Sequence, residues 1–137
     1  MGRIIAIDYG LKRTGLAVTD SLRIIATALD TVSSEQLLSY LTAYFNREKV
    51  DEIVIGMPKN LKNKDTDMTP HVRQLIVKLK ETFKDKPIHE VDERFTSSIA
   101  KQTLIDSGAK KKDRQVKGNV DKISATIILQ DFLTMKR

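Results

Sequence analysis

The sequence predicts an α/β fold in which a five-stranded mixed sheet, made of a three-strand antiparallel meander plus two parallel strands, has helices packed on it. Two observations predict this architecture. Three short apolar segments separated by brief turns fill the first thirty residues, which is typical of an antiparallel meander. The remainder alternates amphipathic helical segments with two short apolar strands, and such alternation places parallel strands in the same sheet.

Length and composition indicate one globular domain, residues 1–137. A chain of 137 residues can surround a single core, and 40% hydrophobic with 31% charged residues is a globular composition. The absence of cysteine excludes disulfides, thiol catalysis and cysteine zinc sites. No apolar run reaches the roughly 18 residues of a membrane helix. We therefore expect no membrane partner and a cytoplasmic location.

The meander consists of three predicted strands. The first covers residues 3–8, which are apolar and β-branched. The second covers residues 14–19 after a short turn flanked by glycines, and the third covers residues 24–29 after another turn. Strands this close in sequence pair most simply in antiparallel fashion.

The next two elements are a helix and a buried strand. Ser33 and Gln36 have the spacing of a capping box, which predicts a helix start. Apolar residues then recur with helical period, namely Leu37, Leu38, Leu41, Tyr44 and Phe45. Residues 52–56 follow as a short strand.

Two more helices flank the predicted fifth strand. Thr69 and Pro70 supply an N-cap and a first-turn proline for the second helix. Residues 88–92 form the fifth strand. A short helix is expected from near Thr96 to near Gly108, since glycine suits a left-handed C-terminal cap.

A basic stretch precedes the last helix and is expected to be a mobile loop ending in the turn residues Gly118 and Asn119. Its cations are Lys110, Lys111, Lys112, Arg114, Lys117 and Lys122. The formal net charge of the chain is +6, which suggests a polyanionic partner such as nucleic acid. The alternative is that this stretch is simply a solvated run of charge.

Asp121 is the most informative residue. At about 100° per residue its direction falls within roughly 20° of Ile128 and Phe132, so its carboxylate is expected to point at the protein. An isolated buried carboxylate is costly unless a cation, hydrogen bonds or a metal compensate it. Alternatively, Asp121 is a first-turn residue that interacts favourably with the helix dipole.

Two further acidic positions follow strands. Asp8 ends the first strand, where a side chain can point into a cleft, although a turn aspartate is the alternative. Asp92 and Glu93 close the fifth strand, and strand alternation lets only one of them share the face of Asp8. The alternative for this pair is a surface ion pair with Arg94.

Together these three positions predict a metal site. Carboxylates brought close to one another repel unless cations bridge them. Oxygen ligands without His or Cys suit Mg²⁺ or Mn²⁺, and paired ions of this kind promote phosphodiester cleavage. Lys12, Arg13, Arg94 and the basic stretch would then contact the phosphate backbone.

The chain resembles the YqgF/RuvX family, RNase H-like relatives of the RuvC Holliday junction resolvases. The resemblance covers almost the whole chain. Its anchors are Ile7-Asp8-Tyr9-Gly10, Lys12-Arg13-Thr14-Gly15, Gly56-Met57-Pro58, the run from Val91 to Thr96, and the segment from Val120-Asp121 through Ala125 to Gln130.

The resemblance implies an RNase H-like fold and a metal-dependent nuclease, with Asp8, Glu93 and Asp121 as catalytic and metal-binding acids. It favours Glu93 over Asp92. Many RNase H-like nucleases carry an acid at the end of strand four, where this chain has Gly56. The implied substrate is the 5′ end of pre-16S rRNA in ribosome biogenesis, with branched DNA of the Holliday junction type, or binding without cleavage, as alternatives. A monomer and a homodimer are both compatible with the sequence.

Overall fold

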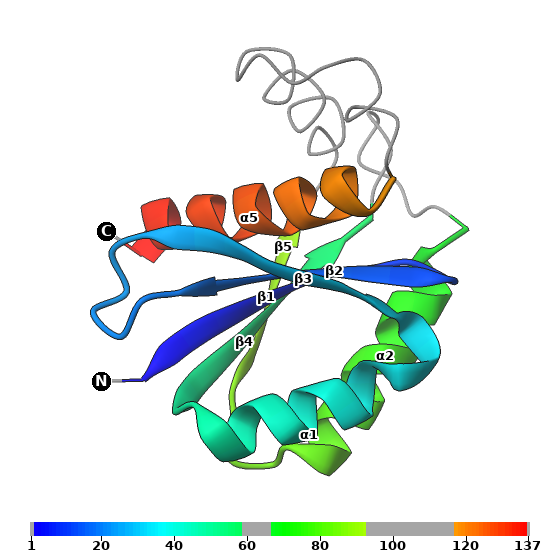
Figure 1. The fold of residues 1–137 in the computed structure, drawn as a ribbon. Coiled ribbons are helices and arrows are strands. Elements are labelled where there is room, and N and C mark those ends of the chain that lie inside the picture. Colours follow the sequence, from blue (N-terminus) through cyan, green and yellow to red (C-terminus); the bar gives the residue numbers. More distant parts are fainter. Residues whose placement is uncertain (1, 59–66, 93–116, 137) are drawn as a thin grey trace.

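A mixed five-stranded sheet lies between two helical layers (Figure 1). The computed structural model describes residues 2–58, 67–92 and 117–136, with the backbone alone at 117–122 and 135–136. Helices α1 (Leu37–Arg47) and α2 (Thr69–Thr82) cover one face of the sheet, and α5 (Lys117–Lys136) covers the other. This confirms the predicted fold class.

The strand order is β3-β2-β1-β4-β5. Strands β1, β2 and β3 form the antiparallel meander, and β4 lies parallel to both β1 and β5, as predicted. The strands span Arg3–Tyr9 (β1), Arg13–Thr19 (β2), Ala26–Ser33 (β3), Val50–Met57 (β4) and Ile88–Asp92 (β5). Because β1, β4 and β5 are parallel, their carboxyl ends meet at one edge of the sheet.

Strand alternation divides the apolar residues into two cores. The core beneath α1 and α2 includes Ile5, Ile7, Leu16, Ile53, Ile55, Leu41, Val72 and Leu79. The core beneath α5 includes Ile4, Ala6, Ala17, Val54, Val91, Ala125, Ile128 and Phe132. Residues two positions apart in a strand lie on the same face of the sheet. The face of a strand residue is therefore known once the residue two positions away is placed in one of the two cores.

The third strand lies further along the chain than predicted. It begins at Ala26 because the Asp20 carboxylate accepts the backbone N–H groups of Ile24 (2.8 Å) and Ile25 (2.9 Å) in the preceding turn. It continues to Ser33, which pairs with Arg13 of β2. The predicted range of 24–29 was thus wrong at both ends.

The predicted capping box at Ser33 was also wrong. The Ser33 side chain makes no capping hydrogen bond, and the chain passes through a short 3₁₀ turn, Ser34–Gln36, before α1 begins. The neighbouring hydroxyl of Ser34 is used instead, in contacts with the turn between β1 and β2. Long-range hydrogen bonds therefore replace the local cap at this junction.

Helix α2 begins at the predicted place with a different cap. Met68 occupies the N-cap position, and Thr69 is the first helical residue. The Thr69 hydroxyl donates to the Pro58 carbonyl at 2.9 Å, so it ties the helix to the end of β4 instead of capping its own first turn. Pro70 lies in the first turn, as predicted.

Helix α5 starts earlier than predicted, at Lys117. Gly118 and Asn119 lie in its first turn, so the turn expected there was wrong. The first N–H groups of a helix have no intrahelical acceptor, and residues that weaken a helix interior are tolerated at this position. The predicted helix from Thr96 to Gly108 and residues 110–116 of the basic stretch lie outside the described residues.

Among the described helices, none has the length and apolar character required to cross a membrane.

Candidate metal and nucleic-acid site

Asp8 lies near the end of β1 on the face of the sheet that α5 covers. Ile4 and Ala6, two and four positions earlier, belong to the core beneath α5, and alternation places Asp8 on the same face. Its side chain is half-buried. Asp8 is therefore a strand residue of β1, whereas the alternative was an ordinary turn aspartate.

Two glycines flank Asp8 along the sheet. Gly15 of β2 is its registered partner. On the other side Ile7 pairs with Ile55, so the next position of β4 beside Asp8 is Gly56. Neither neighbour has a side chain, so no side chain of β2 or β4 flanks the Asp8 carboxylate in this row.

The row of residues before Asp8 on the same face has a side chain on each of the three strands. There Ala6 pairs with Ala17 on β2 and with Val54 on β4. All three are fully buried beneath α5. The row of Asp8 therefore differs from the row before it in having glycine on both neighbouring strands.

Asp92 lies on the opposite face from Asp8. Val91 belongs to the core beneath α5, and Asp92 pairs with Met57 of the core beneath α1 and α2. Of the two adjacent acids that the sequence left open, Asp92 is therefore the one that strand alternation directs away from Asp8. Glu93 lies outside the described residues.

The first turns of α5 carry Asp121, the third predicted acid. Figure 1 shows the amino-terminal end of α5 at the same end of the sheet as the turn between β1 and β2. The side chain of Asp121 is outside the described part of the helix. The backbone thus brings the end of β1, the end of β5 and the start of α5 to one edge.

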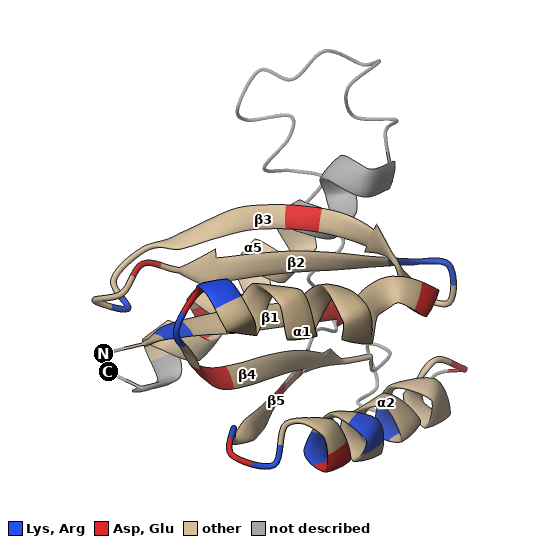
Figure 2. Ribbon diagram, turned by 60° about the horizontal axis from the view of Figure 1, so that its bottom comes forward, with Lys and Arg blue, Asp and Glu red and all other residues tan. Residues whose placement is uncertain are grey.

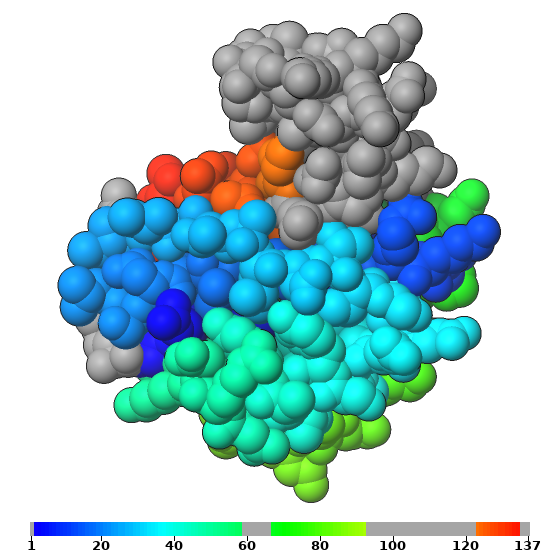
Figure 3. All heavy atoms as spheres, viewed as in Figure 1, coloured from blue at the N-terminus to red at the C-terminus, as the bar shows by residue number. Residues whose placement is uncertain are grey.

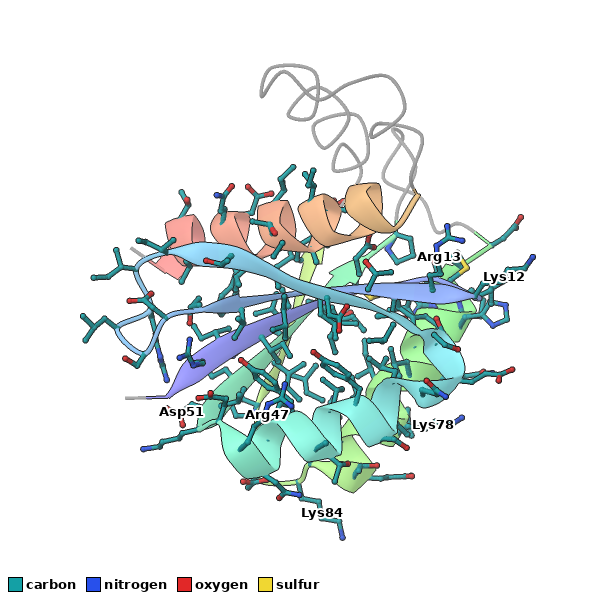
Figure 4. The ribbon with its side chains drawn as sticks, in the orientation of Figure 1. Lys12, Arg13, Arg47, Asp51, Lys78 and Lys84 are labelled. Atoms are coloured by element: carbon teal, nitrogen blue, oxygen red, sulfur yellow. The ribbon has the colours of Figure 1, made fainter. Side chains whose placement is uncertain are left out.

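The turn between β1 and β2 adds positive charge to this edge. Lys12 and Arg13 are exposed and extend from this turn in Figure 4. Figure 2 shows the same turn as a basic end of the β1–β2 hairpin. The other predicted cations lie outside the described side chains, namely Arg94, Lys110, Lys111, Lys112, Arg114, Lys117 and Lys122.

Ser34 holds this basic turn in place. Its hydroxyl donates to the Gly10 carbonyl and is 2.8 Å from the Thr14 hydroxyl, while its backbone N–H donates to the Lys12 carbonyl at 3.0 Å. Gly10 is required in the turn, because a Cβ there would lie 2.5 Å from the Arg13 carbonyl oxygen. These contacts fix the backbone that carries Lys12 and Arg13.

Sequence reasoning missed Ser34 and the pairing of Asp8 with two glycines. Neither has a local signal, because each depends on which residues lie side by side in the sheet. The register of β1 against β2 and β4 was the signal needed.

A second charged cluster lies at the other end of the sheet. Arg23 pairs with Asp51 (2.8 Å) and with Glu52 (2.9 Å), and Glu52 also lies 2.8 Å from Nε2 of His89. The His89 ring packs on Phe132 of α5, with ring centroids 4.9 Å apart. This cluster joins the β2–β3 turn, β4, β5 and α5.

Within residues 2–58, 67–92 and the described side chains of α5, no three His, Asp or Glu side chains gather closely enough to hold a metal ion. The three acids predicted to do so are described only in part, since the structure describes the side chain of Asp8 alone. The described geometry therefore supplies one carboxylate of the predicted set.

Comparison with known sequences identifies a family and relatives that match nearly the whole chain. The family model described as "RuvX: Holliday junction resolvase" matches residues 2–135. A protein of Flavobacterium psychrophilum is 52% identical over 136 residues, which cover 99% of each chain. One from Bacteroides fragilis is 49% identical over 137 residues, covering 100% of this chain and 99% of the relative. Both relatives are named "Putative pre-16S rRNA nuclease".

Comparison with solved structures agrees on the fold. A structure of Thermus thermophilus RuvC in complex with a Holliday junction substrate matches with a TM-score of 0.58 and 13% identity, covering 99% of this chain and 96% of that one. A second structure of T. thermophilus RuvC matches with a TM-score of 0.54 and 12% identity, covering 98% and 96%. At these identities the likeness concerns the fold alone, and it confirms the RNase H-like architecture.

Proposed function

The chain belongs to the RuvX family, and from this membership we propose that it is a metal-dependent nuclease that hydrolyses phosphodiester bonds at the 5′ end of pre-16S rRNA during ribosome biogenesis. The family model spans nearly the whole chain, and relatives of about half-identical sequence carry the name of an rRNA nuclease. The bacterial relatives and the rRNA substrate are consistent with a cytoplasmic site of action.

The observation that carries the proposal is the placement of Asp8. Its carboxylate lies in a strand, on the face that α5 covers and between Gly15 and Gly56. This is the end of the sheet at which β5 ends and α5 begins, and the other two predicted acids come directly after β5 and in α5.

Asp8, Glu93 and Asp121 are the residues that would hold the metal. All three donate carboxylate oxygens, and these suit hard ions such as Mg²⁺ or Mn²⁺. When bound, such ions lower the pKa of a coordinated water and stabilise the leaving oxygen of the phosphodiester. Asp92, on the other face, has no part in this set.

Lys12 and Arg13 would hold the nucleic acid beside these carboxylates. Both extend from a turn at the same edge of the sheet as Asp8, and Ser34 fixes that turn. Cations of this kind bind phosphates without reading sequence, so they position the substrate. Arg94, the cations from Lys110 to Arg114, Lys117 and Lys122 would extend this surface.

A Holliday junction resolvase is the second candidate function. The family model that matches the chain carries that description. Four-way DNA and folded rRNA both present phosphates on closely spaced strands, so the same carboxylates and cations could act on either. The substrate test must therefore include both nucleic acids.

The test incubates the protein with a pre-16S rRNA fragment and with a four-way DNA junction, each with Mn²⁺ or with chelator. We expect Mn²⁺-dependent cleavage of the rRNA fragment, no cleavage in chelator, and a loss of at least about 100-fold in Asp8→Asn, which removes a direct metal ligand. Asp92→Asn is the matched control, because the same substitution on the other face should leave cleavage unchanged.

Other outcomes of this test would support one of the alternative functions. Cleavage of the junction alone would identify a resolvase. Binding of either nucleic acid that is indifferent to Mn²⁺ and never leads to cleavage would identify a binding module and contradict the nuclease proposal. Full activity in Asp8→Asn would show that the assignment of the site is wrong.

A further inference from the structure

The turn between β2 and β3 exposes three large apolar side chains together. Leu22 is 63% exposed, Ile24 55% and Ile25 62%. Elsewhere in the described residues only Leu11 and Val77 are large apolar side chains exposed to a similar degree. Contiguous apolar surface of this kind marks an interaction site more often than isolated exposed residues do. We refer to Leu22, Ile24 and Ile25 as the apolar tip.

The backbone of the apolar tip is held by hydrogen bonds. The Asp20 carboxylate accepts the N–H groups of Ile24 and Ile25, and the Asp20 carbonyl accepts the N–H of Arg23 at 3.0 Å. Arg23 has a φ of 60°, which few residues other than glycine adopt. The turn is thus a defined structure that presents its apolar side chains outward.

The Arg23 side chain anchors this turn to the rest of the molecule. Its guanidinium donates to the Gly2 carbonyl at 3.0 Å and pairs with Asp51 and Glu52. These contacts hold the residue with the unusual backbone conformation against β4 and the start of the chain. The Arg23 guanidinium is already paired with Asp51 and Glu52, so covering the tip need not leave this charge unpaired.

A groove lies directly beside the tip, between the start of β3 and the carboxyl-terminal half of α5. Its open volume is about 440 Å³. Its walls are formed by Ile24, Ile25, Ala26, Gln130, Leu133 and Thr134. Two of the three tip residues, Ile24 and Ile25, therefore also form one wall of this groove, and Figure 3 shows this hairpin at one end of the molecule.

We propose that the apolar tip and this groove form a two-fold interface with a second copy of this chain, in which Leu22 of each copy enters the groove of the other. A two-fold interface uses the same patch on both copies and must be self-complementary. The apolar tip and the groove that it borders meet that requirement. A different protein as partner would have to match only the tip or only the groove.

The available area indicates a weak dimer. A fully buried Leu or Ile side chain removes on the order of 100 Å² of apolar surface from water. Three tip side chains from each copy then give about 600 Å² for the pair, and since Ile24 and Ile25 also line the groove, the total stays below that of most specific interfaces. The dimer should therefore form at micromolar or higher concentrations.

The interface leaves the candidate catalytic edge free. The β2–β3 turn lies at the opposite end of the sheet from the turn that carries Lys12 and Arg13. Both copies could thus bind nucleic acid while associated. The proposal does not depend on the nuclease assignment, and its test needs no nucleic acid.

The experiment measures the mass of the full chain by sedimentation equilibrium from about 1 μM to about 500 μM, the range in which a weak interface associates. We expect the mass to rise from 15.5 kDa toward twice that value. Leu22→Glu, which would put a charge into the partner's groove, should keep the monomer mass throughout. Val77→Glu is the matched control, since it places the same charge on α2, and it should associate like the wild type.

A second variant separates loss of association from loss of folding. Leu22→Ser shortens an exposed side chain without adding charge, and it should also remain monomeric while its circular dichroism and melting temperature match the wild type. A wild-type mass that stays at 15.5 kDa throughout would overturn the proposal. So would a dimer that survives Leu22→Glu or Leu22→Ser, or one that Val77→Glu abolishes equally.

Discussion

At the scale of single residues, the main feature of the candidate site is the pair of glycines beside Asp8. The carboxylate stands in a row with Gly15 and Gly56, whereas the row before it is filled by Ala17 and Val54. A β-strand interior usually disfavours glycine. Glycine on both sides of Asp8 therefore leaves its carboxylate without flanking side chains from β2 and β4 in the same row.

The first prediction concerns Gly56→Val. Valine suits a strand, but Gly56 is buried, so the free energy of unfolding is measured beside the activity. The valine side chain would project beside Asp8 on the face of α5, where it would obstruct ions and phosphate. We expect at least about tenfold weaker Mn²⁺ binding and slower cleavage, measured by metal titration and by rate. Weaker cleavage accompanied by an equal loss of stability would instead indicate a damaged fold.

Individual residues also show how far the sequence determines the site. Asp8 could be identified because a strand ends there. The choice between Asp92 and Glu93 could not be made from spacing, because it depends on which core Val91 faces. The role of Ser34 was not predicted from the sequence, because its partners Gly10 and Thr14 are distant along the chain.

At the scale of secondary-structure elements, local patterns predicted which elements exist, and long-range contacts set their ends. The period of apolar residues identified α1 and α2, and β5 was predicted with its observed bounds. The start of β3 was predicted two residues too early because the Asp20 carboxylate accepts the backbone N–H groups of Ile24 and Ile25, which then do not pair with another strand. Such hydrogen bonds between side chain and backbone compete with secondary structure.

The second prediction concerns the junction of β1 and β4. The Asp51 carboxylate accepts the N–H of Gly2 at 2.8 Å and pairs with Arg23. The Gly2 hydrogen bond is the largest influence that holds the pKa of Asp51 below its ordinary value, and Lys49 and Arg23 act in the same direction. The carboxylate therefore favours the folded state as long as it is ionised.

The sign of the pH dependence follows from this depressed pKa. The stabilisation is fully present above the unfolded value of about 3.9 and is lost as the pH falls through the lower folded value. Asp51→Asn should therefore be less stable than the wild type at pH 7, and the difference should shrink below about pH 4. Urea denaturation at pH 7, 5 and 3 measures it. A difference that is constant with pH would show that ionisation is not involved.

At the scale of the whole molecule, the two faces of the sheet have different tasks. The core beneath α1 and α2 joins the meander to the parallel strands. The core beneath α5 carries the face on which Asp8 lies. The order of elements was predictable because mixed sheets follow from the alternation of segments, whereas the side of the sheet that α5 covers required the structure.

The third prediction compares equal damage to the two cores. Ile128 of α5 and Leu79 of α2 are both fully buried, and truncating either to alanine should destabilise the protein by about 2–5 kcal/mol. Only α5 carries Asp121 and packs on the face of Asp8. At a temperature where both variants remain folded, Ile128→Ala should cleave several-fold more slowly than the wild type, and Leu79→Ala should cleave at the wild-type rate. Equal cleavage by two variants of equal stability would mean that the position of α5 does not control the carboxylates, and the assignment of Asp121 to the site would then be wrong.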